Sequence, residues 1–167
     1  MIRFIRQISF CWLITTGLAV GAEADLQLQD RVLIGEMLAQ YSYRWDGKDS
    51  AGFAALFTED GEMERWVSGA RVDGSVVTGR TGIFEYARSS HQGRLADRQT
   101  RHHFSGLVFK ELSENYAVTE NMALITHQTA GNSPAIASSG IYRITWRKTG
   151  QGWRMAQRIL LTDRFDR

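Results

Sequence analysis

Two histidines and one aspartate are the residues of this sequence best suited to proton-transfer chemistry. Asp46 ends an amphipathic segment just before Gly47, within the stretch YSYRWDGKDSAGFAALFTEDGEM at positions 41–63. His103 and His127 stand in two later segments in which polar and apolar residues alternate. Histidine titrates near neutral pH, and a neighbouring carboxylate fixes its tautomer and stabilises its protonated form. These side chains suit general acid–base catalysis if the fold brings them together.

Strict alternation along the strands predicts which polar side chains share a face. It places His103, His127 and Arg143 on three neighbouring strands, each projecting from an otherwise apolar face. It turns His102 away from the pocket, where that residue would be structural. An arginine and a second histidine near the base would hold an oxygen where charge develops.

Each of these residues also has a purely structural interpretation. Asp46 can cap a turn, as aspartate often does. An inward histidine is often a satisfied core residue, and Arg143 can pair with Glu64. The presence of two histidines on adjacent strands, with an acid at a helix break, leaves the catalytic and structural interpretations evenly matched.

Helical periodicity in the first half of the chain gives way to long alternating segments in the second half. Apolar residues recur at three- and four-residue spacing in the first of three expected helices, at 25–44, 49–57 and 82–91. The expected strands are 62–67, 71–78, 101–111, 116–129, 138–148 and 153–162. This order predicts an α+β fold, in which a curved antiparallel sheet wrapped by three helices encloses a pocket.

Composition narrows the function classes. The chain has 167 residues, one-domain length, and a formal net charge of +2 with no run of basic residues. Nucleic acid is therefore not an expected partner. The one cysteine, Cys11, lies in the N-terminal segment, so thiol catalysis is not expected of the mature domain.

The first 24 residues have the pattern of a secretory signal peptide. Arg3 and Arg6 precede an apolar run at 8–20, and Ala-Glu-Ala at 22–24 supplies a cleavage site before Asp25. The sequence thus predicts a signal peptide at 1–24, a domain at 25–167, and a periplasmic or secreted protein with no membrane contact after cleavage. An uncleaved anchor is the alternative.

The chain resembles the SnoaL-like branch of the NTF2-like superfamily, and within it is most similar to the scytalone dehydratases. The resemblance rests on YRWDGKDSAGFAALFTEDG, TRHHFSGLVF, ALITHQ and TWRKTGQGWRM. It implies an NTF2-like cone with an Asp46–His103 dyad, His127 as a second catalytic residue and Arg143 as a substrate ligand. It also implies a small-molecule substrate, no cofactor and no metal, although Asp46, His103 and His127 have the ligand types of a metal site.

The pocket residues depart from the family pattern. Trp45 stands where the dehydratases have a tyrosine, and Glu64 is aligned with a second tyrosine. Tyr41 or Tyr43 would have to replace these phenols. Arg143, Tyr41, Trp45 and Glu64 are the expected substrate-binding residues. Arg143 replaces an asparagine and suits an anionic or carbonyl-bearing ligand better than scytalone.

The expected function is that of a cofactor-free acid–base lyase, catalysing a dehydratase-like elimination, or an isomerase acting on a small cyclic or hydrophobic substrate. A non-catalytic ligand-binding or dimerisation module of the same fold is the alternative. Alternation also predicts an apolar outer sheet face, and hence a homodimer or higher homo-oligomer. The residues assigned to that face are Phe104, Val108, Met122, Leu124, Tyr142, Ile144 and Trp146.

Overall fold

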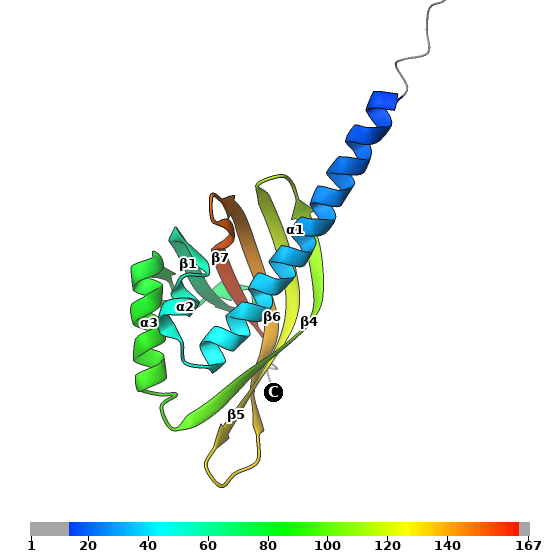
Figure 1. Ribbon diagram of the computed structural model, residues 1–167. Coiled ribbons are helices and arrows are strands. Elements are labelled where there is room, and N and C mark those ends of the chain that lie inside the picture. Colours follow the sequence, from blue (N-terminus) through cyan, green and yellow to red (C-terminus); the bar gives the residue numbers. More distant parts are fainter. Residues whose placement is uncertain (1–13, 164–167) are drawn as a thin grey trace, which may run out of the picture.

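Three helices lie against one side of a curved, open sheet (Figure 1). The computed structural model describes the backbone of residues 14–163 and the side chains of residues 25–163. The helices are α1 (Ile14–Asp46), α2 (Ser50–Ala54) and α3 (Arg80–Gln92). The strands are β1 (Phe57–Val67), β2 (Ala70–Arg71), β3 (Val77–Thr78), β4 (Arg98–Leu112), β5 (Tyr116–Thr129), β6 (Ala135–Thr149) and β7 (Gly152–Thr162). The predicted order of helices and strands holds except at 71–78, where two short strands, β2 and β3, replace the one expected strand, and the second helix ends at Ala54 rather than 57.

The sheet has the order β2-β1-β7-β6-β5-β4, with β3 also paired to β1. Strands β4 to β7 form consecutive antiparallel hairpins. The expectation of a purely antiparallel sheet is wrong at one place, because β1 pairs with β7 in parallel. The long connection through α3 and the three hairpins allows this pairing, since parallel neighbours need a crossover rather than a tight turn. The sheet is therefore mixed.

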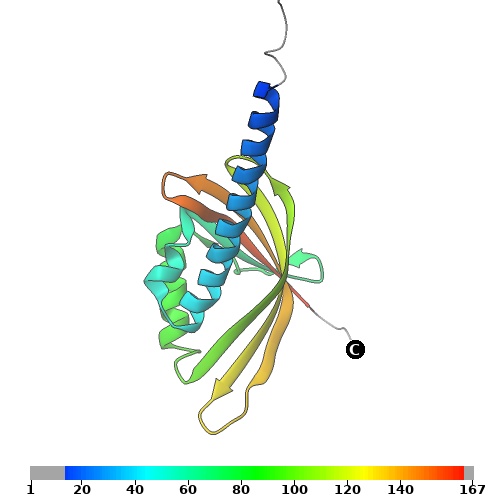
Figure 2. The same cartoon turned by 45° about the vertical axis from the view of Figure 1, so that its right-hand side comes forward.

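Helix α1 crosses the sheet, and its N-terminal end projects beyond it (Figure 2). Its buried side chains, Ile34, Leu38, Tyr41 and Trp45, follow the predicted helical spacing and face the core. Asp30 fastens the helix to the last hairpin. Its carboxylate accepts hydrogen bonds from the Trp153 indole and the Lys148 ammonium, each at 2.8 Å.

A β-bulge at Gly106 divides β4 into two halves of opposite phase. Ser105 pairs with Met122 and Val108 with Glu120, so β4 has one residue more than β5 between these pairs. Gly106 has a φ of +63°, a conformation that glycine adopts without steric cost. Before the bulge, Thr100, His102 and Phe104 point to the helices; after it, Leu107 and Phe109 do.

The outer face of the sheet differs from the prediction. Phe104, Tyr142, Ile144 and Trp146 belong to the core or pack against it, and only Val108, Met122 and Leu124 of the predicted set are exposed. On β6 the side chain of Tyr142 points inward. Tyr142 is paired with Asn121 of β5, and both residues are buried. The apolar residues that the outer face does expose are Val108, Met122, Leu124, Ile136 and Ile141.

The N-terminal segment lies partly outside the described residues. Positions 1–13 are not described, and the backbone of 14–24 continues into α1. The signal peptide, its cleavage before Asp25 and the periplasmic or secreted location stay predictions. Among the helices of residues 14–163, none is both long and apolar enough to cross a membrane.

Candidate active site

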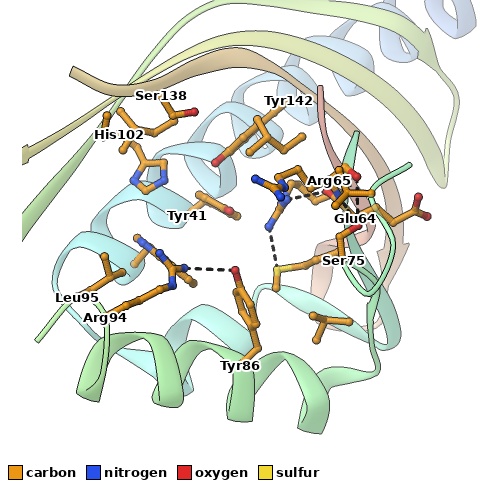
Figure 3. A pocket seen from close by; sticks show the side chains of 18 of the residues that line it. Tyr41, Glu64, Arg65, Ser75, Tyr86, Arg94, Leu95, His102, Ser138 and Tyr142 are labelled. Carbon is orange, nitrogen blue, oxygen red and sulfur yellow. Dashed lines mark hydrogen bonds between the residues drawn. The ribbon is translucent and has the colours of Figure 1, made fainter. Parts of the chain in front are cut away.

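Asp46 and His102 form a buried pair where the end of α1 meets the first half of β4. The Asp46 residue is 7% exposed, and the His102 side chain 6%. Oδ1 of Asp46 lies 2.8 Å from Nδ1 of His102 and accepts a 2.6 Å hydrogen bond from the Thr100 hydroxyl. Oδ2 accepts the backbone N–H of His102 at 2.8 Å. Since Nδ1 is engaged by the carboxylate, Nε2 is the ring nitrogen left for the pocket, which the His102 ring lines (Figure 3).

The expected contact between Asp46 and His103 is absent. His103 is exposed on the outer face of the sheet, where its Nε2 lies 3.2 Å from the Thr126 hydroxyl. The prediction counted strict alternation back from Leu107 and Phe109, and the bulge at Gly106 reverses that count. A glycine inside a strand pattern is a known signal for a bulge, and here it would have pointed to His102.

The environment of Asp46 keeps its carboxylate ionised. Burial on its own would raise the pKa of Asp46, but the hydrogen bond and positive charge of His102, the Thr100 hydroxyl and the His102 backbone N–H together lower it. An ionised Asp46 in turn holds the imidazole of His102 in the tautomer with the proton on Nδ1. The pair is thus arranged so that Nε2 of His102 can accept a proton.

The pocket beside His102 has a volume of about 480 Å³, within the usual range for small-molecule sites. The helices contribute Tyr41 of α1 and Tyr86 of α3 (Figure 3), and Trp45 of α1 also lines the pocket. The sheet supplies the other side, and its main contributors are Met63, His102, Ile125, His127, Ser138, Tyr142, Arg158 and Leu160. Apolar side chains and many polar or charged groups share this lining, and such a concave mixture can serve as a substrate site.

The family and several similar solved structures agree with this architecture. The sequence matches the SnoaL-like domain over residues 26–159. The chain belongs to the SnoaL-like family. A search of curated proteins gives no significant match.

Three solved structures illustrate the similarity. A protein of unknown function from Mycobacterium tuberculosis is 30% identical, with a TM-score of 0.73 over 85% of this chain and 76% of its own. A protein from Novosphingobium aromaticivorans provisionally named a scytalone dehydratase is 26% identical, with a TM-score of 0.68 over 84% and 89%. An NTF2-like protein with a cystatin-like fold from the same organism is 24% identical, with a TM-score of 0.72 over 88% of each chain.

The remaining predicted residues of this SnoaL-like chain fall into two groups. His127, Tyr41 and Trp45 line the pocket. Tyr43, the alternative replacement for the family phenols, is 77% exposed and does not. Burial, followed by the positive charges of Arg98, Arg94 and His102, lowers the pKa of His127.

Arg143 is not a pocket residue, and the expectation that it binds substrate is wrong. It is exposed on the outer face and pairs with Glu120, with 2.8 Å between Nε and Oε1. The suggested pair with Glu64 is also absent. Glu64 borders the pocket, but its carboxylate accepts hydrogen bonds from the Trp66 indole and the Gln157 amide, each at 2.8 Å.

Tyr86, Arg94, Tyr142 and Arg158 are among the pocket residues that sequence reasoning missed. Tyr142 adjoins Arg143 and takes the inward position that had been given to the arginine. On β7, Trp153 and Met155 face inward, so strict alternation would turn Arg158 outward. An irregular pairing between β6 and β7 shifts the alternation after Met155, and Arg158 therefore faces inward. An isolated arginine before the apolar run ILL was the signal available.

Over residues 25–163 no three histidine, cysteine or carboxylate side chains come together in a way that could hold a metal ion. The three possible metal ligands considered from the sequence do not come together, since His103 lies on the face of the sheet opposite to Asp46 and His127.

Proposed function

We propose that this protein is an acid–base lyase or isomerase that acts on a small cyclic or hydrophobic molecule. The contact between Asp46 and His102 at the wall of the pocket carries the proposal. A histidine oriented by a buried carboxylate, with its second nitrogen facing a cavity, is the arrangement of a general base. The SnoaL-like family includes polyketide cyclases and dehydratases, which supports this class of chemistry.

In the proposed reaction, Nε2 of His102 removes a proton from a carbon next to a carbonyl. The electrons of the broken C–H bond form an enolate, whose oxygen needs hydrogen-bond donors. Burial raises the pKa of both Tyr41 and Tyr142, so that both phenols stay protonated and able to donate at neutral pH. This role for the tyrosines replaces the one expected of Arg143.

The second step distinguishes the two outcomes. In an elimination, the enolate electrons form the carbon–carbon double bond as the neighbouring C–O bond breaks, and the proton on His102 passes to the departing hydroxyl to give water. In an isomerisation, the imidazolium returns the proton to a different carbon. His127, whose pKa is lowered by burial and nearby cations, lies in the same pocket as a neutral hydrogen-bonding group.

Proton abstraction can be tested before the substrate is known. A panel of small cyclic ketones and β-hydroxyketones is incubated with the protein in D₂O, and NMR follows deuterium uptake at the α-carbon and loss of water. We expect exchange or elimination with at least one compound. General acid–base catalysis contributes ~10²–10⁴-fold, so Asp46→Asn should reduce the rate by about that factor.

The pair should behave as a unit. The double variant Asp46→Asn/His102→Ala should lose little more activity than His102→Ala alone. Circular dichroism confirms that each variant is folded. Binding of panel members without exchange or turnover would instead identify a non-catalytic module.

A further inference from the structure

The guanidinium of Arg158 is buried at the pocket without a carboxylate partner. Arg158 is 7% exposed and lines the cavity from β7. Nη1 donates to the backbone oxygen of Glu64 at 3.0 Å and Nη2 to the sulfur of Met63 at 3.2 Å, whereas Nε has no hydrogen-bond partner in the described part of the chain. Among the side chains of residues 25–163, no carboxylate forms an ion pair with it. A guanidinium has five N–H donors, so the two bonds to protein atoms use fewer than half.

Burying a cation is costly unless an anion or a full set of hydrogen bonds compensates. Two tyrosine rings provide part of the compensation for Arg158. Its guanidinium carbon lies 5.3 Å from the ring centroid of Tyr142 and 6.0 Å from that of Tyr41. A ring face, a carbonyl and a thioether each offer only partial negative charge, and a bound anion would supply the full charge.

The other charges of the pocket also favour an anion. Arg65 and Arg94 line it, and Nη2 of Arg94 donates to the hydroxyl groups of Tyr86 and Ser90 rather than to a carboxylate. The two acidic lining residues are Glu64, whose carboxylate is bound by Trp66 and Gln157, and Asp73, which is exposed. Arg65 and Arg94 are exposed as Asp73 is, so the lining holds three arginines against two carboxylates, a small excess of positive charge that favours anionic ligands.

We propose that the pocket takes a small apolar molecule carrying a carboxylate, and that Arg158 binds this carboxylate. The planar guanidinium matches a carboxylate through two parallel hydrogen bonds, and Trp45, Ile125 and Leu160 offer apolar surface to the rest of the molecule. In Figure 3, His102 lies across the pocket from Glu64, whose carbonyl holds Arg158. Arg158 thus recognises one end of the molecule while His102 acts on the other, and this assignment rests on the proposed function.

The test uses 2-naphthoate and its neutral isostere 2-naphthamide, with affinities measured by isothermal titration calorimetry at pH 7.5. A charge-assisted contact should make naphthoate bind at least about tenfold more tightly than the amide. Arg158→Gln should abolish this preference. Arg143→Gln, the same change at a guanidinium on the outer face, is the matched control and should preserve it.

A second measurement tests the proposal if the Arg158→Gln variant does not fold. The Nε–H resonance of Arg158 in the unaltered protein, assigned with Arg158→Lys, should shift on titration with naphthoate and not with the amide. Equal affinities for the two compounds, absence of naphthoate binding, or a resonance that does not respond would each overturn the proposal. A preference that Arg94→Gln removes and Arg158→Gln keeps would overturn it as well.

These readouts separate this inference from the proposed function. His102→Ala removes the base but not the guanidinium, so it should lose deuterium exchange and keep the preference for naphthoate. Exchange without a carboxylate preference would leave the acid–base function standing and refute the role of Arg158. A carboxylate preference without exchange would support the role of Arg158 and refute the acid–base function.

Discussion

His102 and His103 are neighbours in the chain, yet they lie on opposite faces of β4 and only His102 reaches Asp46. One histidine is enclosed between the sheet and the helices, and the other is exposed on the outer face. The two residues therefore form a natural pair of test and control positions, identical in side chain and adjacent in sequence.

The first prediction compares His102→Ala with His103→Ala. Loss of the general base should lower kcat by ~10²–10⁴-fold in the first variant, whereas the second should retain nearly the full rate. Steady-state kinetics on any substrate found by deuterium exchange provides the measurement. Equal losses in the two variants would contradict the assignment of His102 as the base.

The second prediction concerns the stability contributed by Asp46. Its pKa is lower in the folded protein than in the unfolded chain, so its ionised form stabilises the fold above the unfolded value of about 3.9. That stabilisation is lost as the pH falls through the folded pKa. Asp46→Asn should cost about 1–3 kcal/mol at pH 7, because a buried charged acceptor loses its hydrogen bonds, and much less in strong acid.

Denaturant unfolding of both proteins at several pH values measures this difference. Asp73→Asn, at an exposed position, is the control and should leave stability nearly unchanged. A cost for Asp46→Asn that did not diminish in acid would show that the ionised carboxylate is not the stabilising form.

The third prediction concerns the charge of His127. Burial and then the charges of Arg98, Arg94 and His102 lower its pKa, so its imidazole should titrate below the ordinary value of about 6.5 and be neutral at pH 7.5. NMR titration of the ring protons measures this directly. Arg98→Gln should raise the pKa of His127, and Arg143→Gln, on the outer face, should not.

The fourth prediction tests the bulge in β4. Position 106 has a φ of +63°, which strains any residue with a Cβ, whereas the terminal carbon of Met122, 2.9 Å from such a Cβ, is the end of an exposed side chain that can move aside. Gly106→Ala should therefore destabilise the protein by about 1–2 kcal/mol. Gly150→Ala meets open space and should have little effect. Thermal unfolding compares the two, and equal stabilities would mean that the glycine is not required for the bulge.

The fifth prediction concerns self-association through the outer face of the sheet. The exposed residues Val108, Met122, Leu124 and Ile141 lie on β4, β5 and β6, so we expect a homodimer or larger homo-oligomer. Met122→Lys should shift sedimentation towards the monomer. Tyr43→Lys replaces an exposed aromatic on α1 and should not. A monomer at micromolar concentration in the unaltered protein would refute the interface.

The sequence predicted those parts of the fold that depend on local patterns. The spacing of Ile34, Leu38, Tyr41 and Trp45 placed the core face of α1 correctly, and Asp49 caps α2 as expected, with its side chain accepting the Gly52 N–H at 2.8 Å. The α+β class followed from these elements and from the hairpin signals, whereas the SnoaL-like family was expected from the resemblance of four sequence stretches, and both are confirmed.

What the sequence did not predict depends on register. One extra residue in a strand moves every following side chain to the other face. The bulge at Gly106 thus exchanged His103 for His102, and the pairing of Asn121 with Tyr142 put the tyrosine, rather than Arg143, inside. Hydrogen bonding between distant segments fixes such details, and composition and periodicity carry little information about it.

The position of β7 between β1 and β6 has a consequence for biosynthesis. During translation β1 emerges early, but its parallel partner β7 emerges only after β4, β5 and β6. Contacts that join distant parts of a chain form slowly and leave partner strands exposed in the meantime. A nascent chain stopped before Gly152 would lack β7, which joins β1 to β6 in the sheet. It would also lack Arg158 of the pocket. Ribosome-bound intermediates of this protein should therefore need protection from aggregation until the last strand leaves the exit tunnel.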